Sequence, residues 1–278
     1  MASFDPRIIS VGLQIDGGLT TFDGLAVTSS GSKTDNSVMN DCTVTIYNLD
    51  TVTRDYILTE TSLLKKSRTP KQIILDAGRE STGLVRVVIG DIIGSAISQP
   101  PDIGLQLKAL TGSWFNGQII SRYNSGNVPV SEIAQKVSED LGVSLNFQAT
   151  DKNVADYSHN GAAIKQIDKL GSMGNFNAYL DDDQLVVKDR GAPLHGSIYA
   201  VNAQNGMIGI PEVTQFGVKV KFLLDTRVRV GDQIIVESTL NRAANGSYVI
   251  YKLSWEIANR DTQFYYIAEA NKLGGFDL

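Results

Sequence analysis

Apolar residues recur at every second position through the first and last thirds of this chain, and this alternation predicts β-strands that each bury one face. In residues 41–49, Cys42, Val44 and Ile46 alternate with more polar side chains, and in residues 218–224 apolar residues alternate with lysines. Short strands separated by turns are typical of a small closed barrel or a sandwich. The expected strands cover residues 8–15, 25–29, 41–49, 72–77, 83–91, 103–110, 218–224, 234–237, 248–255 and 264–269.

The middle third changes to a period of about four residues, which is typical of amphipathic helices. Ile133, Val137 and Leu141 share one face of an expected helix over residues 131–141, and Gly142 follows as a left-handed end. A second helix is expected over residues 161–170, ended by Gly171. A strand over residues 143–147 and a hairpin over residues 176–188 complete a small α/β module.

Two local signals refine this prediction in the flanking segments. Asp50 stands where an N-cap belongs, before a short helix expected over residues 53–58. Asn245-Gly246 favours a hairpin turn, which explains it better than the glycosylation sequon that it forms with Ser247. The predicted fold is therefore β-rich α+β, with two small antiparallel β-barrel domains, residues 1–122 and 191–278, bracketing an α/β module of residues 123–190.

The charge balance argues against a nucleic-acid binding protein, because such a protein needs clustered basic residues to displace counterions from phosphates. The chain has a net charge of -5. Its most basic run has no interleaved aromatic residues to stack on bases, so we expect a solvated loop. That run is Lys65, Lys66, Arg68 and Lys71. With no secretory signal pattern and no stretch of ~20 apolar residues, we expect a protein made in the cytoplasm without a membrane anchor.

Few residues fit the pattern of a catalytic or metal site. Cys42 lies in a strand pattern and is expected to be a buried structural thiol. His159 and His195 have no partner at metal-ligand spacing, so we interpret His159 as a capping or solvated residue and His195 as a loop residue. The run Asp181–Asp183 lacks the spaced oxygens of a calcium loop and is interpreted as the turn of the hairpin.

Two alternative functions remain open at this point. A cell-wall hydrolase would need a carboxylate pair with one acid in an apolar pocket, but Glu132, Glu139 and Asp140 fall off the apolar stripe of their helix and are expected to face water. A glycan-binding module would need exposed aromatic residues, but Trp114 and Trp255 lie in strand patterns typical of a core. The sequence therefore predicts a protein that is not an enzyme, with no catalytic, cofactor-binding or metal-binding residues.

Three stretches of sequence carry a family resemblance. They are TVTIYNLDTVTRDYIL at Thr43–Leu58, GDIIGSAISQPPDIGLQLKALTG at Gly90–Gly112, and GMIGIPEVTQFGVKVKFLLDTRVRVGDQI at Gly206–Ile234. The third is the most specific, because a Gly-x-Pro-x-x-Thr segment, an alternating strand and a Gly-Asp turn occur together. In these stretches the chain resembles the baseplate hub proteins of contractile-tailed bacteriophages, a family that also supplies the hubs of phage-derived tail-like bacteriocins.

The resemblance implies a structural virion protein, the central hub of a tail baseplate, that forms a homotrimer. Each subunit would contribute two barrels shaped like tail-tube protein, so that three copies join the six-fold tail tube to the three-fold spike. The implied partners are the tail tube or tube-initiator protein, the central spike, the tape-measure protein and surrounding baseplate proteins, with DNA present only in transit through the lumen. The implied location is the tail baseplate of the virion, after assembly in the host bacterial cytoplasm.

Overall fold

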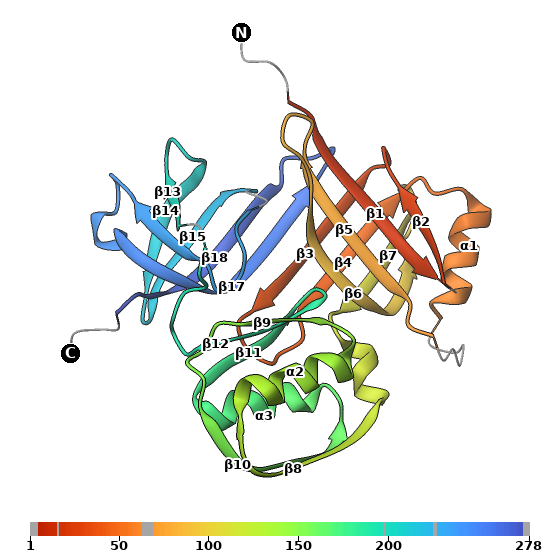
Figure 1. The fold of residues 1–278 in the computed structure, drawn as a ribbon. Helices are drawn as coiled ribbons and strands as arrows, with labels where there is room; N and C mark the ends of the chain where they lie inside the picture. Colours follow the sequence, from red (N-terminus) through yellow and green to blue (C-terminus); the bar gives the residue numbers. More distant parts are fainter. Residues whose placement is uncertain (1–4, 16, 63–68, 197, 225–226, 275–278) are drawn as a thin grey trace.

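The computed structural model describes residues 5–15, 17–62, 69–196, 198–224 and 227–274. Strands of the first and last thirds lie beside each other, and a smaller unit with two helices, built from the middle third, lies against them (Figure 1). This arrangement confirms the predicted β-rich α+β fold class.

The first third forms strands at the positions where apolar residues alternate. Asp50 caps the helix as predicted, because its carboxylate accepts a hydrogen bond of 2.9 Å from the backbone N–H of Thr53. The helix extends two residues beyond the predicted range of 53–58 at each end. The elements are β1 (Arg7–Ile15), β2 (Gly18–Phe22), β3 (Val27–Thr34), β4 (Asp41–Tyr47), α1 (Thr51–Glu60), β5 (Gln72–Arg79), β6 (Gly83–Ile97), β7 (Gly104–Leu110) and the 3-10 helix η1 (Ser113–Gly117).

The middle third contains the two predicted helices and an antiparallel strand pair, β8–β10, that the sequence did not predict. The second helix begins and ends later than expected: residues 161–162 belong to a strand, and Asn175, with φ of 59°, ends the helix instead of Gly171. The elements are β8 (Ile119–Pro129), α2 (Val130–Leu141), β9 (Ser144–Phe147), β10 (Asn153–Ala162), α3 (Lys165–Gly174), β11 (Phe176–Asp181) and β12 (Gln184–Asp189).

The last third returns to strands. Asn245-Gly246 is not a two-residue turn: β16 and β17 pair antiparallel, but residues 238–245 connect them, and the Asn245 carboxamide oxygen accepts from the Ser238 N–H at 2.6 Å. The predicted two-residue turn was wrong, because Asn245 is the last residue of this connection and Gly246 is the first residue of β17. The elements are β13 (Ile198–Asn202), β14 (Met207–Thr214), β15 (Gly217–Leu223), β16 (Gln233–Glu237), the 3-10 helix η2 (Arg242–Ala244), β17 (Gly246–Ala258) and β18 (Phe264–Lys272).

One sheet joins the first and last thirds. Among the described residues it has 13 strands, with the main order β14-β15-β18-β17-β3-β4-β7-β6-β5-β1-β2, while β16 and β13 branch from β17. The predicted closed barrels are therefore not closed. The physical reason is the length of β17, whose first residues pair with β16 and whose later residues, from Lys252 to Ala258, pair with β3.

The contact between β17 and β3 depends on a glycine. A Cβ at Gly31 would lie 2.3 Å from the Asp41 carbonyl oxygen and 2.4 Å from the indole ring of Trp255. The absent side chain makes room for Trp255, which is 1% exposed, and its indole N–H donates to the Ser29 hydroxyl at 3.1 Å. A small residue on β3 thus lets the largest side chain of β17 pack where the two thirds meet.

The buried apolar residues form two cores. The larger core takes side chains from both the first and the last third, including Val44, Leu107, Val220 and Trp255. The smaller core belongs to the middle third, between the helices and the strands that cover them. The predicted division into domains at residues 122 and 190 stays a prediction, and we note that β8 runs across the first of these boundaries.

Candidate functional site at the junction of the module and the sheet

The β11–β12 hairpin of the middle third contacts the large sheet through hydrogen bonds to backbone groups. The Asn40 side-chain amide donates to the Leu180 carbonyl at 2.8 Å, and the Ile89 N–H donates to the Asp182 carboxylate at 2.8 Å. Tyr179, 1% exposed, donates to the carbonyl of Val230 at 3.1 Å. The hairpin is therefore joined to both the first and the last third.

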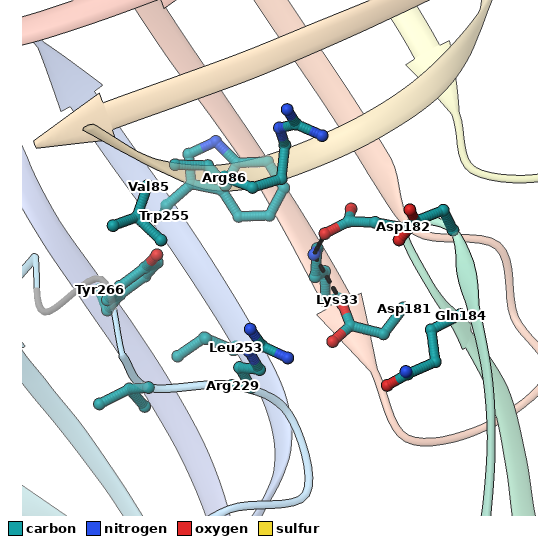
Figure 2. Close-up of a pocket in the computed structure, with 13 residues that line it drawn as sticks. Lys33, Val85, Arg86, Asp181, Asp182, Gln184, Arg229, Leu253, Trp255 and Tyr266 are labelled. Carbon is teal, nitrogen blue, oxygen red and sulfur yellow. Dashed lines mark hydrogen bonds and ion pairs between the residues drawn. The ribbon is translucent and has the colours of Figure 1, made fainter. Parts of the chain in front are cut away.

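Lys33, on β3, forms the centre of this junction. Its ammonium lies 2.7 Å from a carboxylate oxygen of Asp181 and 2.7 Å from one of Asp182, and these side chains are 10–13% exposed. Figure 2 shows the ammonium held between the two carboxylates. Burial acts to lower the pKa of Lys33, but the two aspartates outweigh it and raise the pKa above its usual value.

Burial has the opposite effect on the pKa of Asp182 from its effect on the pKa of Lys33. Its burial raises the pKa of its carboxyl, against the opposing effect of the Lys33 charge. Because Lys33 stays protonated, it cannot act as a nucleophilic amine. The cluster therefore has a structural role: it pairs two carboxylates of the β11–β12 hairpin with an ammonium on β3.

A second buried ion pair lies on the same hairpin. Lys188, on β12, is 1% exposed, and its ammonium lies 3.2 Å from the carboxylate of Asp35. Burial lowers the pKa of Lys188 and raises that of Asp35, and the attraction between the two opposes both shifts. The Asn177 side-chain amide adds a hydrogen bond of 2.8 Å to the Asp35 carbonyl. Three lysine–aspartate ion pairs thus hold the hairpin on the sheet: the hairpin supplies both carboxylates around Lys33 and the ammonium beside Asp35.

A pocket of about 270 Å³ opens beside the first ion pair. Its wall includes Lys33, Arg86, Asp182, Arg229 and Trp255, which come from all three thirds of the chain (Figure 2). The Arg86 guanidinium is itself paired with Asp76 at 2.5 Å. The pocket therefore marks the point at which the three thirds meet.

Asp232, in the turn before β16, predicts a dependence of stability on pH. Burial raises its pKa to about 6, while its carboxylate accepts a hydrogen bond of 2.8 Å from the Arg229 N–H. A raised carboxyl pKa means that ionisation in the folded state costs stability above that pH. We expect Asp232→Asn to be more stable than the unsubstituted protein by about 1–2 kcal/mol at pH about 8, with the difference vanishing as the pH falls through 6 towards 4.

Thermal unfolding of the two proteins across this pH range checks the expectation about Asp232. The Asn side chain can still accept the Arg229 hydrogen bond, so the comparison isolates the charge. A difference in melting temperature that stays constant with pH would contradict it.

A second polar cluster, within the middle third, corrects the prediction for Asp140. Its side chain is 6% exposed, not in water, because Arg122 of β8 donates to it through Nε at 3.0 Å and through a second guanidinium nitrogen. Gln166 also donates to Asp140 at 3.2 Å and accepts from the Tyr157 hydroxyl at 3.3 Å. The unpredicted β8–β10 pair covers this side of the helix. Glu132 and Glu139 are exposed, as predicted.

The structure also places the remaining singled-out residues. Cys42 is 3% exposed, and burial raises its pKa to about 12, which confirms a structural thiol. The His159 ring lies 3.1 Å from the Ala162 carbonyl on β10, so it neither caps a helix nor points freely into water. His195 is an exposed loop residue, as predicted.

The basic run gives one correction. Lys71, directly before β5, is 7% exposed and pairs with the carboxylate of Glu60, the last residue of α1, at 2.9 Å, so it is a buried residue and not part of a solvated loop. Lys65, Lys66 and Arg68 lie outside the described residues.

The two tryptophans differ. Trp255 is core, as expected, whereas Trp114 lies in the 3-10 helix η1, is half-buried and lines a separate pocket. Its placement in a strand was wrong.

Among the described residues, no three His, Cys, Asp or Glu side chains gather as metal ligands. No helix in the described ranges is both long and apolar enough to span a membrane.

Comparisons with known proteins agree with this architecture. Residues 8–270 match the model of a family described as baseplate hub gp41. No protein among the curated sequences matches the chain. In structure, the chain is similar to the 43 kDa tail protein of prophage MuSo2 from Shewanella oneidensis, with a TM-score of 0.66 and 7% identity over 97% of each chain.

Two further solved structures have the same fold. A tail protein from Neisseria meningitidis MC58 gives a TM-score of 0.64 at 9% identity, covering 96% of this chain and 97% of that one. The E. coli c3393 protein, a component of the type VI secretion system, gives 0.62 at 12% identity, covering 95% of this chain and 78% of that one. The c3393 protein is described as structurally similar to the T4 bacteriophage tail proteins gp27 and gp5.

Proposed function

The chain belongs to the baseplate hub gp41 family of structural phage tail proteins, and on that premise we propose that it forms the trimeric centre of a tail baseplate. The observation that carries the proposal is the match to this family over residues 8–270. The first and last thirds of the chain are the two β-rich halves of one subunit. Three copies would present six such halves to the six-fold tail tube and a three-fold face to the spike. Rings of this kind are built from head-to-tail contacts that close.

The sheet supports this role because it makes the two halves of one subunit a single body. β17 pairs with β3 along seven residue pairs, and the larger core is shared between the halves. The buried ion pairs of Lys33 and Lys188 hold the middle third against the same sheet. A subunit built in this way would keep its two halves in fixed positions around a ring.

The proposed partners follow from a place between tube and spike. They are a second and third copy of the chain, the tail tube or tube-initiator protein, the central spike, the tape-measure protein and the surrounding baseplate proteins. DNA would pass through the ring without being held, which suits a chain with a net charge of -5. We propose that the protein is assembled in the host bacterial cytoplasm and resides in the virion.

We further propose that the protein is not an enzyme. The acid of a cell-wall glycosidase needs a raised pKa so that it stays protonated. The Arg122 hydrogen bonds instead lower the pKa of Asp140, the most enclosed of the carboxylates considered for that role. Clearing of purified peptidoglycan by the pure protein in a zymogram would overturn this part of the proposal.

The copy number gives the main test. We expect native mass measurement of the purified chain, mixed with its spike protein, or cryo-electron microscopy of the tail tip, to show three copies around one axis. The reason is that a three-fold ring of two-part subunits matches both neighbours. A ring with another number of copies, or a chain that stays monomeric and joins no tail or spike protein, would contradict the proposal.

A further inference from the structure

Two arginines lie directly opposite each other in the pair of strands β1 and β5. Arg7 is the first residue of β1, Arg79 is the last residue of β5, and the antiparallel register makes them partners (Figure 1). Side chains of directly opposed residues lie on the same face of a sheet, and like charges in this arrangement are destabilising. The strand pair by itself therefore does not favour two arginines at these positions.

Both arginines lie on the core-facing side of their strands. Arg7 has the same alternation as the buried Ile9, and Arg79 has that of the buried Ala77. Their guanidinium carbons lie over one ring, that of Phe264 on β18, at 5.3 and 5.7 Å from its centroid. Phe264 is 1% exposed and belongs to the larger core, whereas both arginines are half-buried. The ring thus holds both guanidiniums at the rim of the core, where solvent still reaches them.

Neither arginine has a carboxylate partner within the part of the chain that the structure describes. The ion pairs there include neither of them. Arg7 donates to the backbone carbonyl of Asp261, and Arg79 donates to that of Asp5 at 3.1 Å. The Asp5 carboxylate itself accepts from the N–H and the hydroxyl of Ser81, at 3.1 and 2.8 Å. Because a guanidinium has several N–H donors, one carbonyl bond leaves most of them available to a ligand.

The chemistry of the pair selects an oxyanion. The parallel N–H donors of a guanidinium match the two oxygens of a carboxylate, and such charge-assisted bonds are among the strongest in proteins. The surroundings favour one carboxylate over a nucleic-acid backbone. Asp5 and Asp261 supply the accepting carbonyls, and the exposed Glu80 follows Arg79 in the chain. Three acidic side chains beside the pair would repel a row of phosphates, whereas two arginines attract a single negative charge.

We propose that Arg7 and Arg79 form a binding site for one carboxylate, an Asp or Glu side chain presented by a partner protein. The source of the carboxylate rests on the proposed function, because a neighbouring tail protein has to supply it. In the free chain the two opposed charges lower stability, and the partner's carboxylate neutralises them. The site thus adds a directional, charged contact at the end of the core that the first and last thirds share.

The melting temperature of the isolated chain tests the site. The probe is glutamate blocked at its amino and α-carboxyl groups, which offers only the side-chain carboxylate, and blocked glutamine is its uncharged counterpart. We expect saturating blocked glutamate to raise the melting temperature by about 2–4 °C above NaCl of equal ionic strength, since it binds only the folded chain. Blocked glutamine should have no effect. Equal shifts with the two probes, or a larger shift with a single-stranded DNA oligonucleotide, would overturn the carboxylate site.

Substitution shows whether the two arginines carry this response. Arg79→Gln keeps a donor for the Asp5 carbonyl but removes the charge opposite Arg7, so the response to blocked glutamate should disappear. Without probe, we expect it to melt within about 2 °C of the unsubstituted chain, because the lost repulsion and the lost contact with the aromatic ring are of similar size. Arg7→Gln should behave in the same way. The matched control is Arg86→Gln, which should respond fully, because the Arg86 guanidinium is paired with Asp76 at 2.5 Å. A much larger fall in melting temperature for Arg79→Gln, or a response that persists in it, overturns the proposal, because the arginines would then only hold the core together.

Cryo-electron microscopy of the tail tip identifies the source of the carboxylate. We expect an Asp or Glu side chain of another chain within ion-pair distance of both guanidiniums. Solvent alone between them, or a phosphate, would overturn the proposed partner. The outcomes separate this site from the proposed function. A chain that responds to blocked glutamate but forms no three-fold ring contradicts the proposed function and leaves the site in place, whereas a three-fold ring of chains without the response overturns the site alone.

Discussion

Lys33→Ala is expected to lower the free energy of unfolding by about 3–5 kcal/mol, which is the usual cost of removing one partner from a buried ion pair. The loss arises because Asp181 and Asp182, each 13% exposed, would be left buried without the ammonium that pairs with both carboxylates. The hairpin that carries both carboxylates is the attachment of the middle third to the sheet. Urea unfolding, followed by far-UV circular dichroism, measures the change.

A matched variant separates charge from packing in this experiment. Lys33→Met combined with Asp181→Asn and Asp182→Asn removes the three charges together, and we expect it to recover most of the lost stability, since neutral residues of similar volume often replace buried ion pairs without loss. The pair between Lys165 and Asp168 is exposed, so Lys165→Ala should change stability by less than about 1 kcal/mol. A loss for Lys33→Ala as small as that for Lys165→Ala would show that the buried pairs do not hold the hairpin.

Trp255→Ala is expected to lower the free energy of unfolding by about 3–5 kcal/mol, the cost typical of truncating a large buried aromatic residue. The indole is 1% exposed and lies over Gly31, in the part of β17 that pairs with β3. Its removal would leave a cavity between the first and last thirds and would leave the Ser29 hydroxyl without the indole donor. Thermal unfolding, together with the loss of the near-UV signal of a fixed indole, measures the effect.

Trp114→Ala is the matched control, because it removes the same side chain from a half-buried position in η1. We expect a clearly smaller loss there. Trp255→Phe should keep part of the packing but lose the hydrogen bond to Ser29. Its free energy of unfolding should therefore lie between those of the unsubstituted protein and Trp255→Ala. Equal losses for the two alanine variants would contradict the assignment of Trp255 to the joint between the thirds.

Most of the sheet was predictable because its strands bury one face. Alternation locates strands such as β4 and β15, and the period of four locates α2, with Gly142 at its end in the left-handed conformation. The pair β8–β10 was missed for a physical reason. It is a two-stranded ribbon rich in glycine, serine and asparagine, with few buried residues, so neither strand has a regular apolar face.

The junction could not be predicted because its partners are distant in sequence. Lys33 and Asp181 are 148 residues apart. Each lies among polar residues, and such a pattern predicts a turn or an exposed strand end. Lys188 offered one signal, since it directly follows the apolar run Leu185, Val186 and Val187, and these four central residues of the strand are all buried. Asp140 was misplaced for a related reason: helical spacing defines its face but does not reveal that β8 covers that face.

The length of β17 has a mechanical consequence. A flexible linker between the two halves would let either half swing when a tail changes shape. Here the halves meet along seven residue pairs between β17 and β3, running antiparallel. A pull that draws one strand along the other loads these backbone hydrogen bonds together, in shear, instead of opening them one after another. The sheet is thus continuous across the subunit, and the β17–β3 pairing transmits force from one half to the other.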